Sequence, residues 1–138
     1  MKPKLLLRIA AVLMFIHCVL HTIGFSGWKT DPTRQVVIKA MTGQKLPFMG
    51  ANRSMGEFYD GFGYASTIAL LLIAVSLWIV SGELASRALA KKMILTLAVI
   101  LAFWGLDEII FFFPFATSIS WLSAICCFWA YFSLGKQP

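Results

Sequence analysis

Charged residues are scarce in this sequence: only 13% of its 138 residues are Asp, Glu, Lys or Arg, whereas 59% are hydrophobic. An ordinary soluble domain carries about 25% charged residues, so the composition excludes a soluble globular domain and intrinsic disorder. Cysteine is scarce as well. The three cysteines, Cys18, Cys126 and Cys127, lie inside apolar runs without a CxxC motif, which excludes a disulfide scaffold.

Acidic residues are fewer than basic ones, and the formal net charge is +6. This excess does not predict a nucleic-acid partner, because most of the basic residues flank apolar runs, where positive charge sets membrane orientation. The flanking basic residues are Lys2, Lys4, Arg8, Arg87, Lys91, Lys92 and Lys136.

Four apolar stretches are each long enough to cross a hydrocarbon core of about 30 Å, which takes roughly 20 helical residues. Because lipid cannot satisfy backbone hydrogen bonds, these stretches predict four packed helices. We therefore expect an all-α integral membrane four-helix bundle, forming a single domain over residues 1–138. The expected helices cover residues 5–25, 54–81, 92–113 and 116–134.

The first apolar run begins with basic residues, as a secretory signal does. It carries two histidines and lacks an Ala-x-Ala cleavage site, so we expect an uncleaved first membrane helix. An even number of crossings places both termini on one side. With the termini inside, seven basic residues lie inside and five outside, which favours cytoplasmic termini.

Residues 26–53 form the one extended polar segment. Asp31 followed by Pro32 signals a helix start and Gly43 a helix end, which predicts a short amphipathic helix in this first extramembrane loop. Such a helix would lie on the membrane surface or cover the bundle, either as a simple connector or as a gate. Its expected apolar flank comprises Val36, Val37, Ala40 and Met41.

The second membrane helix is expected to begin before its apolar run. Ser54 and Glu57 match the Ser-x-x-Glu capping box, in which the two side chains satisfy reciprocal backbone amides. Small residues predict two further places where helices approach closely. One is the ladder of Gly61, Ala65 and Ala69, and the other is the seam of Ser120, Ala124 and Cys127.

Ionisable side chains inside the predicted helices are the strongest functional signal, because each costs several kcal/mol in lipid unless it meets a cavity or a partner. At about 1.5 Å per helical residue, six such groups fall at one depth in the outer half of the membrane. The six are His17, His21, Glu57, Asp60, Asp107 and Glu108. We expect them to line an outward cavity, with imidazoles opposite carboxylates. Alternatively, they form pairs that only fix helix packing.

Three chemistries would suit such a cavity. His17, His21 and Glu57 would supply three ligands and an open fourth position, which suits catalytic zinc, although the HExxH motif is absent. A haem would need axial histidines on separate helices, whereas His17 and His21 lie on the same predicted helix, which disfavours a haem. Acid–base chemistry on a lipid-like substrate is the third, with His21, Glu57 and Asp107 as the catalytic candidates.

Four motifs, HTIG, FMGANRS, EFYDGFG and FFFP, resemble those of a family of small four-helix bacterial inner-membrane proteins that are similar in architecture to DoxX-like proteins. The likeness covers nearly the whole chain. It implies the same fold and a bacterial inner-membrane location, but no particular reaction. The positions that it singles out are His21, Gly24, Met49, Gly50, Arg53, Phe58, Tyr59, Gly61 and Gly63.

We therefore expect a polytopic membrane protein that binds a small amphipathic or lipid-like ligand in an outward polar cavity, with Arg53 available for an anionic head group. A membrane enzyme and a helper subunit of a membrane complex are the alternatives. Membrane lipid is the expected partner, a homo-oligomer is an option, and no nucleic acid is expected. The expected ligand-binding residues are His17, His21, Arg53, Glu57, Tyr59, Asp60, Asp107 and Glu108.

Overall fold

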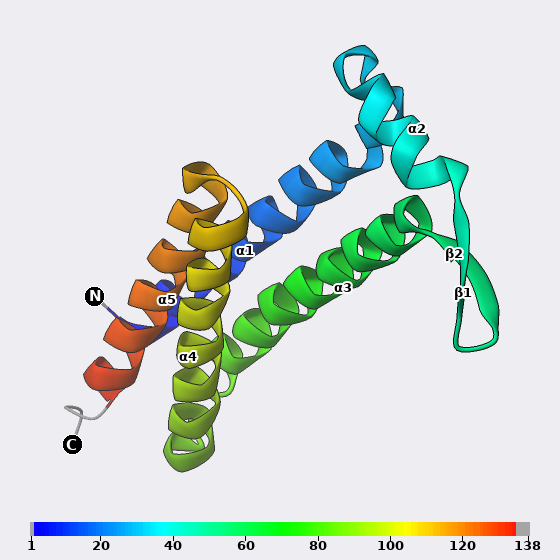
Figure 1. Ribbon diagram of the computed structural model, residues 1–138. Coiled ribbons are helices and arrows are strands. Elements are labelled where there is room, and N and C mark those ends of the chain that lie inside the picture. The colour runs from blue at the N-terminus through cyan, green and yellow to red at the C-terminus, as the bar shows by residue number, and fades with distance from the viewer. Residues whose placement is uncertain (1, 135–138) are drawn as a thin grey trace. The chain divides into compact units, whose positions relative to one another are not determined.

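The computed structural model describes residues 2–134 (Figure 1), so Lys136, counted above among the basic residues, lies outside the described part. Within this range, four helices are long and apolar enough to cross a membrane. The predicted all-α fold of four packed helices is confirmed, and the chain is a multi-pass membrane protein. The elements are α1 (Pro3–Ser26), η1 (Trp28–Thr30), η2 (Pro32–Arg34), α2 (Gln35–Gly43), β1 (Lys45–Phe48), β2 (Ala51–Ser54), α3 (Met55–Gly82), α4 (Arg87–Phe111) and α5 (Pro114–Leu134).

The long helices match their predicted ranges closely, and α4 differs most. It begins at Arg87, five residues before the predicted start, because the residues that precede the apolar run are good helix formers. Its end is fixed by Phe112, whose N–H donates to the Glu108 carbonyl at 3.0 Å. Pro114 then opens α5, a position where its missing N–H costs nothing.

Contacts divide the chain into two compact units, which we describe separately. The first, here called the bundle unit, combines residues 2–18 with residues 70–134. It contains the beginning of α1, the end of α3, and all of α4 and α5. The second, here called the loop unit, comprises residues 19–69.

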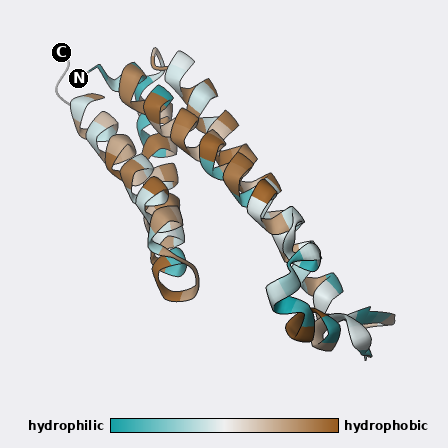
Figure 2. Ribbon diagram, turned by 90° about the horizontal axis from the view of Figure 1, so that it is seen from above, coloured by the Kyte–Doolittle hydropathy of each residue, from teal (hydrophilic) through white to brown (hydrophobic). Residues whose placement is uncertain are grey.

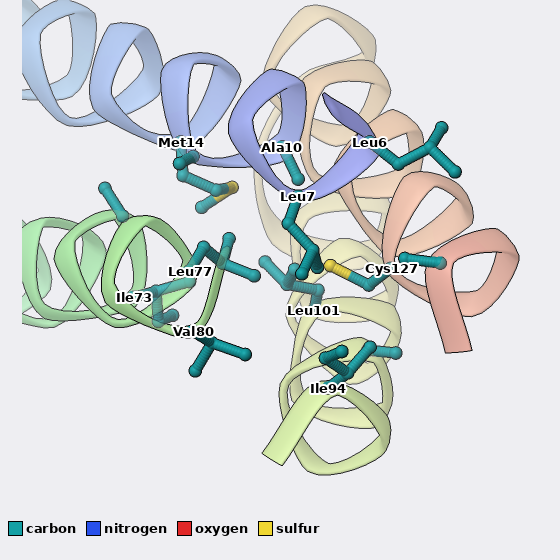
Figure 3. Packing of buried hydrophobic residues seen from close by; sticks show 14 of the residues in the cluster. Leu6, Leu7, Ala10, Met14, Ile73, Leu77, Val80, Ile94, Leu101 and Cys127 are labelled. Atoms are coloured by element: carbon teal, nitrogen blue, oxygen red, sulfur yellow. The ribbon is translucent and has the colours of Figure 1, made fainter. Parts of the chain in front are cut away.

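The bundle unit has a hydrophobic core to which all four of its helices contribute. Figure 3 shows Leu7, Leu77, Leu101 and Cys127, one from each helix, pointing toward one another, and each of these side chains is fully buried. Because lipid tails are as apolar as leucine, close packing holds such helices together in a membrane more than the exclusion of water does.

The contact between α4 and α5 depends on small residues. The predicted seam is confirmed, since Ser120, Ala124 and Cys127 are completely buried. On the α4 side, Gly105 faces Trp121, and a Cβ on Gly105 would lie 2.7 Å from the indole Nε1. Only glycine at this position leaves room for the indole ring.

The outward faces of the long helices are apolar. Figure 2 shows hydrophobic residues along them, and side chains such as Ile79, Phe103 and Ile125 are exposed. The turn between α4 and α5 exposes several phenylalanines, among them Phe112 and Phe113, as predicted for the interfacial end of a membrane helix. Such faces suit contact with lipid rather than with water.

The loop unit contains the predicted short helix, as η2 followed by α2. Asp31 starts it, because its Oδ1 accepts hydrogen bonds from the amide of Thr33 at 2.9 Å and from its hydroxyl at 2.6 Å. These hydrogen bonds hold the pKa of the exposed Asp31 carboxyl below its ordinary value. The sequence signal for this helix start was therefore correct.

Of the predicted apolar flank of this helix, Met41 packs against a small buried cluster. Val36 and Val37 are exposed, and Ile38 is the buried residue of α2. Ile38 packs with Phe25 and Trp28, which come from another part of the loop unit. Hydropathy along a short helix does not reveal which face such neighbours will cover.

A β-hairpin, which the sequence did not predict, follows α2. Phe48 pairs with Ala51, so the turn consists of Met49 and Gly50. Both have positive φ angles, 48° and 87°, as a type I′ turn requires. The usual Asn-Gly or Asp-Gly signal is absent here. The hairpin matters for function because β2 carries Arg53 to the beginning of α3.

The capping box predicted at the start of α3 is confirmed. The Ser54 amide donates to Glu57 Oε2 at 2.7 Å, and the Glu57 amide donates to Ser54 Oγ at 3.2 Å. These two hydrogen bonds fix both the first turn of α3 and the position of the Glu57 carboxylate.

The tight approach at Gly105 leads to a test of the bundle packing. We expect Gly105→Ala to lower the free energy of unfolding by about 1–2 kcal/mol, because the clash with Trp121 outweighs the higher helix propensity of alanine. Gly24→Ala in α1 is the matched control, since no atom lies within 4 Å of its Cβ position. Unfolding in mild detergent would measure both variants. Equal stability of the two would contradict the close approach.

Candidate functional site

The six predicted ionisable groups are divided between the two units. The bundle unit holds His17, Asp107 and Glu108, and the loop unit holds His21, Glu57 and Asp60. The expectation that all six line one cavity stays a prediction. Each unit nevertheless contains its own cluster of polar side chains, which can be described in full.

In the bundle unit, an imidazole meets a carboxylate. His17 Nε2 lies 3.2 Å from Glu108 Oε1, and the two side chains are only 7% and 5% exposed. Trp104 Nε1 donates to the same Glu108 oxygen at 3.0 Å, and Ser120 Oγ lies 3.4 Å from His17 Nδ1. Three helices, α1, α4 and α5, therefore meet at this cluster, in which each charged form lowers the burial cost of the other.

The direction of Glu108 follows from its place on α4. It ends the row of buried residues on this helix, which consists of Ala90, Ile94, Ala98, Leu101, Gly105 and Glu108. Trp104 lies one helical turn earlier, so its indole can reach the carboxylate. Asp107, in contrast, is exposed. Adjacent helical residues differ in direction by about 100°, and only the second of this acidic pair points into the core.

The cluster contains a polar atom without a partner. Glu108 Oε2 is buried and makes no hydrogen bond to any residue between 2 and 134, and the same holds for Trp121 Nε1. A buried polar group without a hydrogen bond costs roughly 1–3 kcal/mol. Chemically, the His17–Glu108 pair can hold a proton and pass it across the 3.2 Å contact.

In the loop unit, His21 contacts the backbone rather than a carboxylate. Its Nε2 lies 3.2 Å from the Gly63 carbonyl oxygen, and its ring stacks on Phe25 at a centroid distance of 6.0 Å. A Cβ on Gly63 would lie 2.0 Å from the Phe25 ring. The close approach predicted for Gly61 therefore occurs at Gly63, while Gly61 has no atom within 4 Å of its Cβ position.

Asp60 is bound by two residues that the sequence analysis did not single out. Trp28 Nε1 donates to Asp60 Oδ1 at 2.8 Å, and Lys29 forms an ion pair with Asp60 Oδ2. The Trp28 ring is buried, so its N–H needs such an acceptor. Tyr59 packs edge-on against this ring at 4.8 Å and remains partly exposed.

Glu57 and Arg53 form the third polar group of the loop unit. Arg53 Nη1 donates to Glu57 Oε1 at 3.2 Å, and both side chains are partly exposed. Glu57 is already oriented by the capping box, so the carboxylate in turn orients the guanidinium. An exposed ion pair of this kind adds little to the stability of the fold. The guanidinium of Arg53 is therefore better suited to binding than to holding the fold together.

These groups border a pocket of about 430 Å³ on the surface of the loop unit. Its lining consists of Arg53, Glu57, Phe58, Asp60, Gly61, Phe62 and Ala65. Three of the predicted ligand-binding residues, Arg53, Glu57 and Asp60, are thus brought together, whereas Tyr59 and His21 are not among the lining residues. The lining therefore combines three charged side chains with apolar side chains such as those of Phe58 and Phe62.

No arrangement for a metal ion occurs in the described part of the chain. Within residues 2–134, no three His, Cys, Asp or Glu side chains are grouped so that they could hold one ion. His21 contacts Gly63, and Glu57 contacts Ser54 and Arg53. The zinc set of His17, His21 and Glu57 draws on both units and stays a prediction, and within the described loop unit no ion pair joins His21 to Glu57.

The residues that the sequence analysis missed are the hydrogen-bond partners: Trp28, Lys29 and Trp104. One local signal was available. Trp104 precedes Glu108 by four residues, so the two share a helix face. Trp28 and Lys29 lie about thirty residues before Asp60 in the sequence, and only the fold brings them together.

No protein family, curated protein or solved structure matches the chain. Its length and its four apolar helices make it a small polytopic membrane protein. Any more specific function has to be argued from the pocket and from the buried pair.

A double-mutant cycle tests the buried pair. We expect His17→Leu and Glu108→Leu each to lower the free energy of unfolding by about 3 kcal/mol, because each leaves the other ionisable side chain buried without its main partner. The double variant should lose clearly less than the sum of the two, since neither ionisable group remains in the core. Asp107→Asn, at the exposed neighbouring position, is the control and should change stability by less than about 0.5 kcal/mol. Additive losses would mean that the pair is not coupled.

Proposed function

We propose that the protein binds a small amphipathic, lipid-like molecule in the pocket at the beginning of α3. The observation that carries the proposal is the lining of this pocket, which combines charged side chains with apolar ones. The polar end of the ligand would meet Arg53, and its apolar part would lie against Phe58 and Phe62. The volume of about 430 Å³ falls within the range of small-molecule sites.

Arg53 suits an anionic head group. A guanidinium has five N–H donors in a planar fork, and the bond to Glu57 uses one of them. The remaining donors match the paired oxygens of a phosphate or carboxylate. Glu57 would act as a positioning residue, because it holds the guanidinium in place before the ligand arrives.

Gly61 favours binding of an apolar chain. No atom lies within 4 Å of its Cβ position, so this lining residue leaves space where any other side chain would project. Phe62 is 71% exposed, a large apolar area at the same place. A hydrocarbon chain covering both would fill the space beside Gly61 and pack against the Phe62 ring.

The membrane supplies the context for this ligand. We infer that the termini are cytoplasmic, because more basic residues lie on that side of the predicted topology, and that the pocket opens outward. The motif resemblance favours the bacterial inner membrane. Lipid is then the nearest source of an amphipathic ligand, and association into a homo-oligomer stays a separate prediction.

An acid–base enzyme is the alternative that a specific observation favours, namely the His17–Glu108 contact. Both side chains are nearly inaccessible, so a substrate would have to displace a neighbour such as Trp104 or Ser120. The open pocket requires no such displacement. For this reason we place binding ahead of catalysis and ahead of a helper role that leaves the pocket empty.

Binding of lysophosphatidic acid, a single-chain lipid with a phosphate group, tests the proposal. We expect Arg53→Gln to weaken binding by about 10- to 100-fold, as the loss of a charged hydrogen bond implies. Gly61→Leu should abolish binding, because the leucine side chain would fill the pocket. Native mass spectrometry of protein in mild detergent would measure retention of the lipid.

Lys39→Gln is the matched control, because Lys39 is an exposed cation outside the pocket and the change removes the same charge. Monoacylglycerol, which lacks the phosphate, should bind the wild type and Arg53→Gln equally. The proposal fails if Arg53→Gln and Lys39→Gln retain lysophosphatidic acid alike, or if Gly61→Leu retains it.

A further inference from the structure

A second pocket, of about 420 Å³, lies in the bundle unit, next to the residues that follow α3. It is built where α1 and α4 begin and where α5 ends. Its lining consists of Lys2, Pro3, Lys4, Leu84, Ala85, Arg87 and Leu134. None of these residues belongs to the ligand pocket proposed above or to the His17–Glu108 cluster.

The charged side chains that line this pocket within residues 2–134 are all basic. Lys2, Lys4 and Arg87 contribute three cations, and no acidic residue of that range is part of the lining. Glu83, the nearest acidic residue in the sequence, lies outside it. A concave site lined by charge of one sign attracts counter-ions more strongly than a scatter of surface charges does.

Helix ends of both polarities meet at this pocket, since α1 and α4 begin here and α5 ends here. Neither α1 nor α4 has an acidic residue in its first turn. Ser86, at the N-cap of α4, makes no side-chain hydrogen bond to the first-turn amides. The first turn of α4 therefore lacks a side-chain cap, in contrast to α3, where Ser54 Oγ accepts a hydrogen bond from the Glu57 amide.

The remaining lining is apolar. Pro3, Leu84, Ala85 and Leu134 give the pocket hydrocarbon walls beside its cations. The volume of about 420 Å³ would hold about fourteen water molecules at about 30 Å³ each, which is more than a bare anion needs. Basic pockets between membrane helices on the cytoplasmic side suit the head groups of anionic phospholipids.

Membrane orientation alone does not account for this arrangement. The orientation effect of basic residues needs positive charge near the helix ends, but it does not need the charges to converge on one pocket. Lys91 and Lys92 satisfy the same orientation effect and are not part of the lining. The three lining cations, in contrast, come from two segments that are more than eighty residues apart in the sequence.

The geometry points to a binding site for a phosphate group in this pocket, with the head group of an anionic phospholipid as its source. The phosphate would contact Lys4, Arg87 and the uncapped amides of α4, and the glycerol and first acyl carbons would lie against Leu84 and Leu134. This site is independent of the pocket at Arg53, since the two share no residue.

The test uses short-chain phosphatidylglycerol, added to purified protein in an uncharged detergent and detected by native mass spectrometry. We expect the double variant Lys4→Gln with Arg87→Gln to bind it about tenfold more weakly or worse. The matched double variant Lys91→Gln with Lys92→Gln removes the same charge at the same end and should bind like the wild type. Short-chain phosphatidylcholine, which carries no net charge, should bind weakly to all.

A second variant separates binding from folding. Ser86→Asp should keep or raise the stability of α4, because aspartate is a better N-cap, and should still weaken phosphatidylglycerol binding by adding a negative charge beside the site. Inorganic phosphate distinguishes the sources. If inorganic phosphate displaces phosphatidylglycerol at a concentration similar to that of the lipid, the site takes soluble phosphate compounds. If inorganic phosphate does not displace it, the lipid is the ligand.

Two results would overturn the inference. If both double variants lost binding equally, general attraction by net charge would explain the effect. If phosphatidylglycerol bound no better than phosphatidylcholine and inorganic phosphate did not bind, the pocket would have no phosphate site. Neither result depends on Arg53, so the proposed function can stand or fall separately.

Discussion

The lack of water in the hydrocarbon core is the constraint on which this structure depends, because a polar group there is costly unless it finds a partner within the protein. Small hydroxyl residues meet this demand locally: Ser123 donates to the Ile119 carbonyl at 2.9 Å, and Ser81 to the Trp78 carbonyl at 2.6 Å. An ionised carboxylate only accepts hydrogen bonds, so Glu108 depends on donors that other residues bring. It thereby ties α4 to α1.

The fold was largely predictable because its main signals are local. The length of an apolar run decides whether it spans a membrane, and the spacing of Ser54 and Glu57 sets the start of α3. The hairpin was missed because Met49 stands where Asn or Asp usually marks a type I′ turn. The burial of Ile38 in α2 was missed for a different reason: it depends on Phe25 and Trp28, which the local pattern does not contain.

The candidate site was predictable in part. Counting residues predicts a depth for the ionisable groups but not their direction, and direction decides whether Glu108 or Asp107 enters the core. Partners were harder to predict than the groups themselves, since hydrogen bonds such as that between Trp28 and Asp60 join distant parts of the chain. Burial nevertheless requires such partners, so a buried carboxylate in a membrane helix predicts that a donor exists before its identity is known.

The two pockets use basic residues in different ways. At the beginning of α3, Arg53 is balanced by Glu57, and Asp60 by Lys29, so the surroundings of the pocket carry little net charge and recognition there depends on the geometry of the guanidinium. Where α1 and α4 begin, the lining holds three cations and no acid, so attraction there depends on charge. Charge attraction weakens as salt screens it, whereas an oriented hydrogen-bond fork beside an apolar wall keeps more of its selectivity. In the two proposed sites, basic residues would therefore select by shape beside Arg53 and by charge beside Lys4.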